Sequence, residues 1–224
     1  MTLERELAAA APRLTERVLG EMYANPFWRE RFGDRGRLHA GKDGDFHVRY
    51  LCESLAAGDH GVFINYARWL RELLVARGMC SRHLAENFER LAQAIDDEPW
   101  PDRARAVATL HTGAHSLTYV DGEPGALDQS RGELATRAAG ADLSRDELDI
   151  HLSYLADAVA AAEPTRFASY LQFLGGWFAR CDRPVAHLHA SLRRLGEAIA
   201  ERHVLPTVAT YLETARTALP AEAT

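Results

Sequence analysis

The feature that most constrains the fold of this chain is an internal repeat. Residues 46–95 align with residues 150–199 without a gap, so that each residue of the first segment has a counterpart 104 positions later. Self-similarity of this kind indicates one structural unit that occurs twice. Similar helical composition alone would match alanine and leucine, whereas polar and aromatic side chains also match here. The identical pairs are His47/His151, Tyr50/Tyr154, Leu51/Leu155, Ala56/Ala160, Ala57/Ala161, Phe63/Phe167, Tyr66/Tyr170, Leu70/Leu174, His83/His187, Leu84/Leu188, Arg90/Arg194, Leu91/Leu195, Ala94/Ala198 and Ile95/Ile199.

The hydrophobic pattern is that of helices. Apolar residues recur at spacings of three and four, and the alternating runs typical of strands are absent. Residues 62–77 carry an apolar stripe and an opposite charged face, which is typical of an amphipathic helix on a core. Ser144 and Glu147 form the pattern of a capping box at a helix start. Residues 24–42 are predicted to form a short helix and a loop, and the main helices are predicted near 3–23, 43–57, 61–77, 81–97, 102–119, 126–139, 145–162, 165–181, 185–202 and 206–218.

These patterns predict an all-α fold, a helical bundle formed by an internal tandem duplication of a three- to four-helix unit with pseudo-twofold symmetry. The first helical repeat, with an N-terminal helix, is expected over residues 1–119, and the second over residues 120–224. Their cores are residues 46–95 and 150–199. The stretch VDGEPG, residues 120–125, is rich in turn-forming residues and is expected to link the repeats.

The composition restricts the partners. The net charge is −6 and the arginines are interspersed with acidic residues, so we expect no basic surface for nucleic acid. No apolar stretch reaches the roughly 20 residues that span a bilayer, and no signal peptide is recognised, so a cytoplasmic protein without membrane contact is expected. Cys52, Cys80 and Cys181 form no CxxC pair and are expected to be free thiols. The partners that fit are a protein, a small molecule, or a second copy in a homodimer.

The repeated histidines are candidate binding residues. His47 and His151 are expected in the first turns of one helix of each unit, and His83 and His187 in the first turns of another. Because short connections make successive helices antiparallel, both helix starts are expected at the same end of each unit. That arrangement would permit a shared site.

Carboxylates precede the first histidine in both copies. Asp45 and Asp149 each lie two residues before a repeated histidine, and histidine with carboxylate suits iron, zinc or manganese. In the alternative interpretation these carboxylates stabilise the helix dipole and the histidines only hold helices together. The candidate metal ligands are Asp45, His47, His83, Asp149, His151 and His187.

Aromatic residues of the second helix in each unit allow two interpretations. Their helical spacing indicates core packing, or else a pocket for a flat cofactor such as haem with a histidine as axial ligand. Gly175 and Gly176, before Trp177, would allow close helix packing or admit a ligand. The candidate ligand-binding residues are His47, Tyr50, Tyr66, Trp69, His83, His151, Tyr154, Tyr170, Trp177 and His187.

Residues 47–84 follow the pattern H-x-x-Y-L-x-x-x-L-A-x-G-D-x-x-x-F-x-x-Y-x-R-W-L…R-G…H-L. This pattern resembles a helical module of bacterial sensory and regulatory proteins, which in some of them precedes a cobalamin-binding domain. The cobalamin-ligating pattern DxHxxG is absent from this chain. The resemblance therefore implies a sensor or interaction module without a cobalamin site of its own.

Motifs of common enzyme classes are missing, because the sequence contains no GxGxxG after a strand, no GxxxxGK[ST], no GxSxG and no HExxH. The leading hypothesis is a non-enzymatic, cytoplasmic helical sensor or interaction protein that binds a small ligand or a protein partner. The alternative is a helical protein with a His-ligated metal or haem and a redox or storage role.

Overall fold

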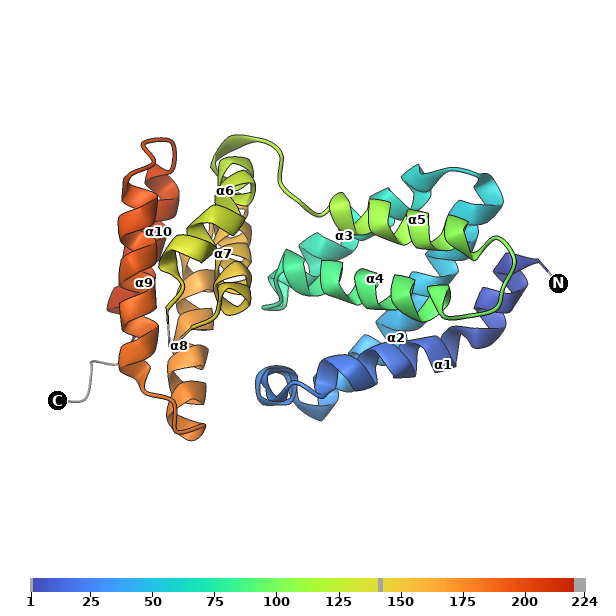
Figure 1. Ribbon diagram of the computed structural model, residues 1–224, viewed down its shortest axis with the longest axis horizontal. Helices are drawn as coiled ribbons and strands as arrows, with labels where there is room; N and C mark the ends of the chain where they lie inside the picture. The colour runs from blue at the N-terminus through green and yellow to red at the C-terminus, as the bar shows by residue number, and fades with distance from the viewer. Residues whose placement is uncertain (1, 141–142, 220–224) are drawn as a thin grey trace. The chain divides into compact units, whose positions relative to one another are not determined.

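The computed structural model describes residues 2–140 and 143–219, and in these ranges it contains helices and no strand (Figure 1). The all-α prediction is confirmed. None of the described helices combines the length and the apolar character needed to cross a lipid bilayer. The helices are α1 (Leu3–Tyr23), α2 (Pro26–Ala57), α3 (His60–Ala76), α4 (Ser81–Asp96), α5 (Arg103–His115), α6 (Gly122–Ala138), α7 (Arg145–Ala160), α8 (Pro164–Arg180), α9 (Val185–Ala200) and α10 (Pro206–Thr217).

Two compact units make up the chain, and each has its own core. The first contains the residues up to Leu73 together with His83–Leu117, and the second contains Leu74–Arg82 together with the residues from Thr118 onward. The connection between α3 and α4 is therefore part of the second unit. That the two units arose by duplication and are related by a pseudo-twofold axis remains a prediction from the sequence.

In the first unit, α1 packs along α2, and α2 also contacts α5. A Cβ atom on Gly44 would lie only 2.3 Å from Cγ2 of Thr15, so the absence of a side chain at this position lets α2 approach α1. Gly113 of α5 lies against the ring of Phe63 in the same way, where an added Cβ would be 2.4 Å from a ring carbon. The core of this unit includes Leu7, Leu14, Leu51, Phe63, Phe88, Ile95 and Leu110.

The prediction of a loop within residues 24–42 is wrong, because α2 begins at Pro26 and continues to Ala57. The carboxamide of Asn25 accepts a hydrogen bond from the N–H of Phe27 at 3.0 Å, and a proline suits the first helical position. The break falls at Gly33 alone, whose φ of +61° lies in the left-handed region that favours glycine. The other glycines of this stretch weaken an isolated helix, but packing on α1 holds them in α2.

In the second unit, α6 packs along α7, and α10 contacts α7, α8 and α9. The predicted capping box is confirmed, since Ser144 Oγ accepts from the N–H of Glu147 and the Glu147 carboxylate accepts from the N–H of Ser144. The predicted linker over 120–125 is too long, because α6 already begins at Gly122. The core includes Leu127, Leu134, Leu148, Leu155, Phe167, Phe178, Leu195 and Leu212.

Candidate functional site

A buried pair of histidine and tyrosine joins α2 to α3 in the first unit. Nδ1 of His47 and the hydroxyl of Tyr66 lie 2.6 Å apart, and the two side chains are 3% and 5% exposed. His47 also packs edge-on against Phe88 of α4, with ring centroids 5.1 Å apart. The pair thus lies where three helices of this unit meet.

The same contacts recur in the second unit at the offset of the repeat. Nδ1 of His151 on α7 lies 2.8 Å from the hydroxyl of Tyr170 on α8. Tyr154 stacks on Tyr170 with ring centroids 3.6 Å apart, as Tyr50 stacks on Tyr66 at 4.1 Å. The repeated histidine–tyrosine pairs and stacked tyrosines therefore make equivalent contacts within each unit.

Burial keeps both histidines neutral. It lowers the pKa of His47 to about 3 and that of His151 to about 4; around His151, Glu147 raises the pKa slightly and Arg183 lowers it. Burial also raises the pKa of the Tyr66 phenol far above its usual range, so this hydroxyl keeps its proton. The Tyr66 hydroxyl and Nδ1 of His47 therefore form a hydrogen bond between two neutral groups. A neutral, hydrogen-bonded pair of this kind stabilises a helix contact.

The other two repeated histidines differ in their surroundings. His83 is buried and packs against Phe27 and Trp28, with ring centroids 5.4 and 4.7 Å away. His187 is only half-buried, in the first turn of α9. The expectation that His47 lies in a first turn is wrong because α2 begins at Pro26, so the helix-dipole argument does not apply to that histidine.

The candidate metal ligands do not form a cluster in the part of the chain that the structure describes. No group of three or more histidine, cysteine, aspartate and glutamate side chains that could hold a metal ion occurs there. Asp45 is exposed on α2. Asp149 pairs with Arg131 at 2.8 Å and with Arg82 at 3.7 Å.

The stacked tyrosines leave no space between their rings for a flat cofactor. Each ring covers the face of its partner at 4.1 Å in the first unit and 3.6 Å in the second. Trp177 is half-buried beside Phe173 and Phe178. A pocket beside His47, lined also by Thr15 and Asn87, has room for about one water molecule.

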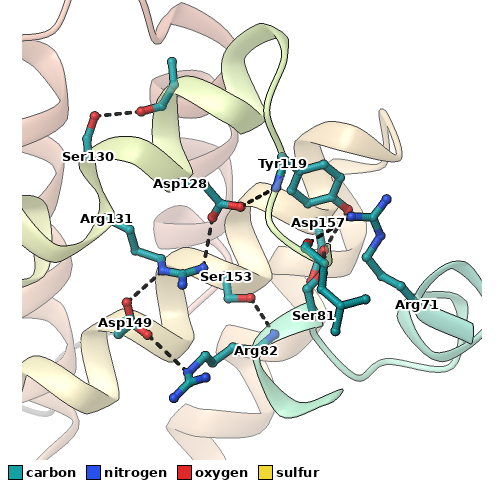
Figure 2. A network of polar contacts seen from close by, with 12 residues as sticks. Arg71, Ser81, Arg82, Tyr119, Asp128, Ser130, Arg131, Asp149, Ser153 and Asp157 are labelled. Carbon is teal, nitrogen blue, oxygen red and sulfur yellow. Dashed lines mark hydrogen bonds and ion pairs between the residues drawn. The ribbon is translucent and has the colours of Figure 1, made fainter. Parts of the chain in front are cut away.

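A polar network in the second unit was not predicted from the sequence (Figure 2). Asp157 of α7 is 2% exposed and accepts hydrogen bonds from the N–H of Ser81 at 2.7 Å, from the hydroxyl of Ser81, and from the hydroxyl of Tyr119 at 2.8 Å. Figure 2 shows Ser81 and Tyr119 converging on this carboxylate. These three hydrogen bonds involve both carboxylate oxygens of Asp157.

Two neighbours of Asp157 on α7 hold the same connection between α3 and α4. Ser153 Oγ accepts from the N–H of Arg82 at 3.1 Å, and the hydroxyl of Tyr154 donates to the carbonyl of Gly78 at 3.2 Å. The face of α7 that carries Ser153, Tyr154 and Asp157 is therefore covered by the turn at Gly78 and the first turn of α4. In the sequence, the one indication of this face was that Tyr154 is identical to its counterpart Tyr50 in the repeat.

The corresponding face of the first unit is exposed. We call it the aromatic face and define it by Phe46, Arg49, Tyr50 and Glu53 of α2 and Trp69 of α3. Trp69 is 58% and Phe46 45% exposed, which is unusual for such large apolar side chains. The guanidinium of Arg49 lies 4.8 Å from the ring centroid of Phe46 and 5.2 Å from that of Tyr50, so cation and rings form one continuous surface.

No protein-family model matches the chain, and searches of curated proteins and of solved structures find no match either.

Proposed function

We propose that this protein is a non-catalytic helical interaction module that binds a protein partner through the aromatic face of its first unit. The observation that carries the proposal is the exposure of Trp69 and Phe46 beside Arg49 and the stacked Tyr50. Tryptophan, tyrosine, phenylalanine and arginine are the residues that interfaces enrich and on which their binding energy concentrates.

The repeated His–Tyr pairs have a structural role in this proposal. The His47–Tyr66 pair lies beneath the aromatic face, since Tyr50 stacks directly on Tyr66, which is hydrogen-bonded to His47. A rigid support reduces the entropy lost when a partner binds. The recurrence of these contacts at the offset of 104 also supports the proposed duplication of one helical unit.

A protein partner is favoured over a small ligand because the aromatic face is a surface feature, whereas small-molecule sites are concave. A His-ligated metal or haem is less supported, because both imidazoles are buried and Nδ1 of each already contacts a tyrosine hydroxyl. We place the module in the cytoplasm, in keeping with Cys52, Cys80 and Cys181, which form no disulfide with one another.

Photo-crosslinking in cells tests the proposal. A benzophenone amino acid replaces Phe46 or Trp69 on the aromatic face, and as a control Leu38, which is 62% exposed on the same helix but outside this face. We expect protein adducts from positions 46 and 69 that disappear in the Arg49→Ala background, and none from position 38. Equal yields at all three positions, or no adduct at any of them, would contradict the proposal.

A further inference from the structure

We infer that the pocket beside His47 is the binding site of one water molecule, which bridges Thr15 of α1, His47 of α2 and Asn87 of α4. This inference is independent of the proposed partner. All three residues belong to the first unit and line the pocket, which has room for about one water. A buried water typically makes about three hydrogen bonds to polar groups that otherwise have no partner.

The hydroxyl of Thr15 is the strongest support. Thr15 is 8% exposed, and its buried Oγ1 has no hydrogen-bond partner among the described residues. It lies at the contact with α2, because a Cβ atom built on Gly44 would be 2.7 Å from it. Threonines inside helices commonly donate to the carbonyl four residues earlier, as do Thr109, Thr112, Thr136, Thr210 and Thr214. A buried hydroxyl that does not make this bond needs another partner.

The second polar group is the imidazole of His47. Its Nδ1 contacts the hydroxyl of Tyr66 at 2.6 Å, and Nε2 has no hydrogen-bond partner among the described residues. The ring is 3% exposed and lines the pocket. In a neutral imidazole one nitrogen donates and the other accepts, and water can do either. A water molecule therefore suits Nε2 in both tautomers of His47.

The third polar group is the carboxamide of Asn87. Its Nδ2 donates a long hydrogen bond of 3.4 Å to Sδ of Met22, and its oxygen accepts none from the described residues. The lining thus offers a hydroxyl, an amide and an imidazole that burial keeps neutral. Because none of these groups carries a charge that would offset the cost of burying an ion, the site favours water over a small cation or anion.

The second unit has the same histidine–tyrosine pair in different surroundings. Leu148, which is fully buried, stands 104 positions after Gly44. Ser191, the counterpart of Asn87, already accepts a hydrogen bond from an arginine of α9 at 2.9 Å. Nε2 of His151 is buried without a hydrogen-bond partner among the described residues. The water is therefore expected beside His47, where a glycine stands in place of the leucine.

The bound water would extend an existing hydrogen bond into a chain through the first unit. Tyr66 of α3 contacts His47 of α2, and the water continues from His47 to α1 and α4. Residues on four helices are then joined, although Thr15 and Asn87 make no direct hydrogen bond to the histidine. Removing one of the water's partners should therefore lower stability.

Thr15→Val tests the inference, because valine keeps the shape of threonine and removes only the hydroxyl. If the hydroxyl binds the water, we expect the thermal midpoint to fall by about 2–4 °C. If the hydroxyl is an unsatisfied buried group, its removal should leave the midpoint unchanged or raise it. The control is Thr112→Val in α5, whose hydroxyl donates to the carbonyl of Ala108 at 2.8 Å. Circular dichroism verifies that both variants are folded.

A crystal structure of the wild type that resolves ordered water supplies the second measurement. We expect one water within hydrogen-bond distance of both Thr15 Oγ1 and Nε2 of His47. Either of two results would overturn the inference: a midpoint of Thr15→Val that equals or exceeds that of Thr112→Val, or the absence of ordered water at these two atoms.

Discussion

The phenol oxygen of Tyr66 lies 2.6 Å from Nδ1 of His47, in the core where α2, α3 and α4 meet. Removing the phenol oxygen leaves a buried imidazole nitrogen without its hydrogen bond. We expect Tyr66→Phe to lower the free energy of unfolding by about 1–3 kcal/mol. Urea denaturation followed by circular dichroism measures the loss, with Tyr211→Phe, at a half-buried position on α10, as the control. A change within the error of that control would show that this hydrogen bond contributes nothing.

Acid should destabilise the protein through the same histidine. Burial lowers the pKa of His47 to about 3 in the folded state, whereas an unfolded chain protonates histidine near pH 6.5. The unfolded state therefore binds more protons below pH 6.5, and stability present above that pH is lost as the pH falls toward 3.

The buried histidine should set the slope of this pH dependence. We expect His47→Gln to reduce it by up to about 1.4 kcal/mol per pH unit between about pH 6 and pH 4. Urea titrations at a series of pH values measure the slope, with His111→Gln on the exposed face of α5 as the control. An unchanged slope in His47→Gln would mean that this imidazole is protonated in the folded state.

Asp157 and Glu53 occupy equivalent positions, 104 residues apart, but only Asp157 is buried under three donors. We expect Asp157→Asn to cost about 2–4 kcal/mol, because the neutral amide cannot satisfy the N–H and two hydroxyls as the carboxylate does. Glu53→Gln should change stability by no more than about 0.5 kcal/mol. Thermal unfolding of both variants tests the contrast, and similar midpoints would contradict the assigned network.

Two glycines of α2 should respond oppositely to alanine. In Gly44→Ala the new methyl would lie 2.3 Å from Thr15 and must push α1 away, so we expect a loss of about 1–3 kcal/mol. The nearest atom to a Cβ on Gly41 is 3.8 Å away, so Gly41→Ala should gain up to about 1 kcal/mol of helix propensity. Equal signs in chemical denaturation would argue against the close α1–α2 contact.

Elemental analysis and an absorption spectrum decide the metal and haem alternative. We expect the purified, untagged protein to be colourless and to carry less than stoichiometric iron, zinc or manganese. His47→Ala and His151→Ala should lower stability without changing metal content, because both side chains are buried packing partners. Stoichiometric metal that disappears in either variant would establish the alternative.

The sequence predicted those features that depend on local pattern. The apolar spacing in residues 62–77 and the Ser144 capping box both correspond to observed helices. The repeat also selected Tyr50, Tyr66, Tyr154 and Tyr170, which stack in pairs between helices that follow one another in the chain.

Features that depend on packing between distant segments could not be predicted. Three glycines within residues 33–41 are typical of a loop, and only the contact with α1 makes most of that stretch helical. Nothing near Asp157 in the sequence indicates that Ser81, 76 positions earlier, supplies two of its hydrogen bonds. Trp69 is exposed because no other described segment packs over it. The spacing of apolar residues along a helix does not indicate which of them another segment will cover.

The inclusion of Leu74–Arg82 in the second unit has a consequence for dissecting the protein. A fragment that begins at Thr118 would leave Asp157 without Ser81 and Tyr154 without the carbonyl of Gly78. Truncation between the repeats is therefore expected to yield an aggregation-prone fragment, even though the cut falls in a connection. During synthesis, residues 74–82 leave the ribosome before α7, so the second unit can complete its fold only with a segment that was translated within the first.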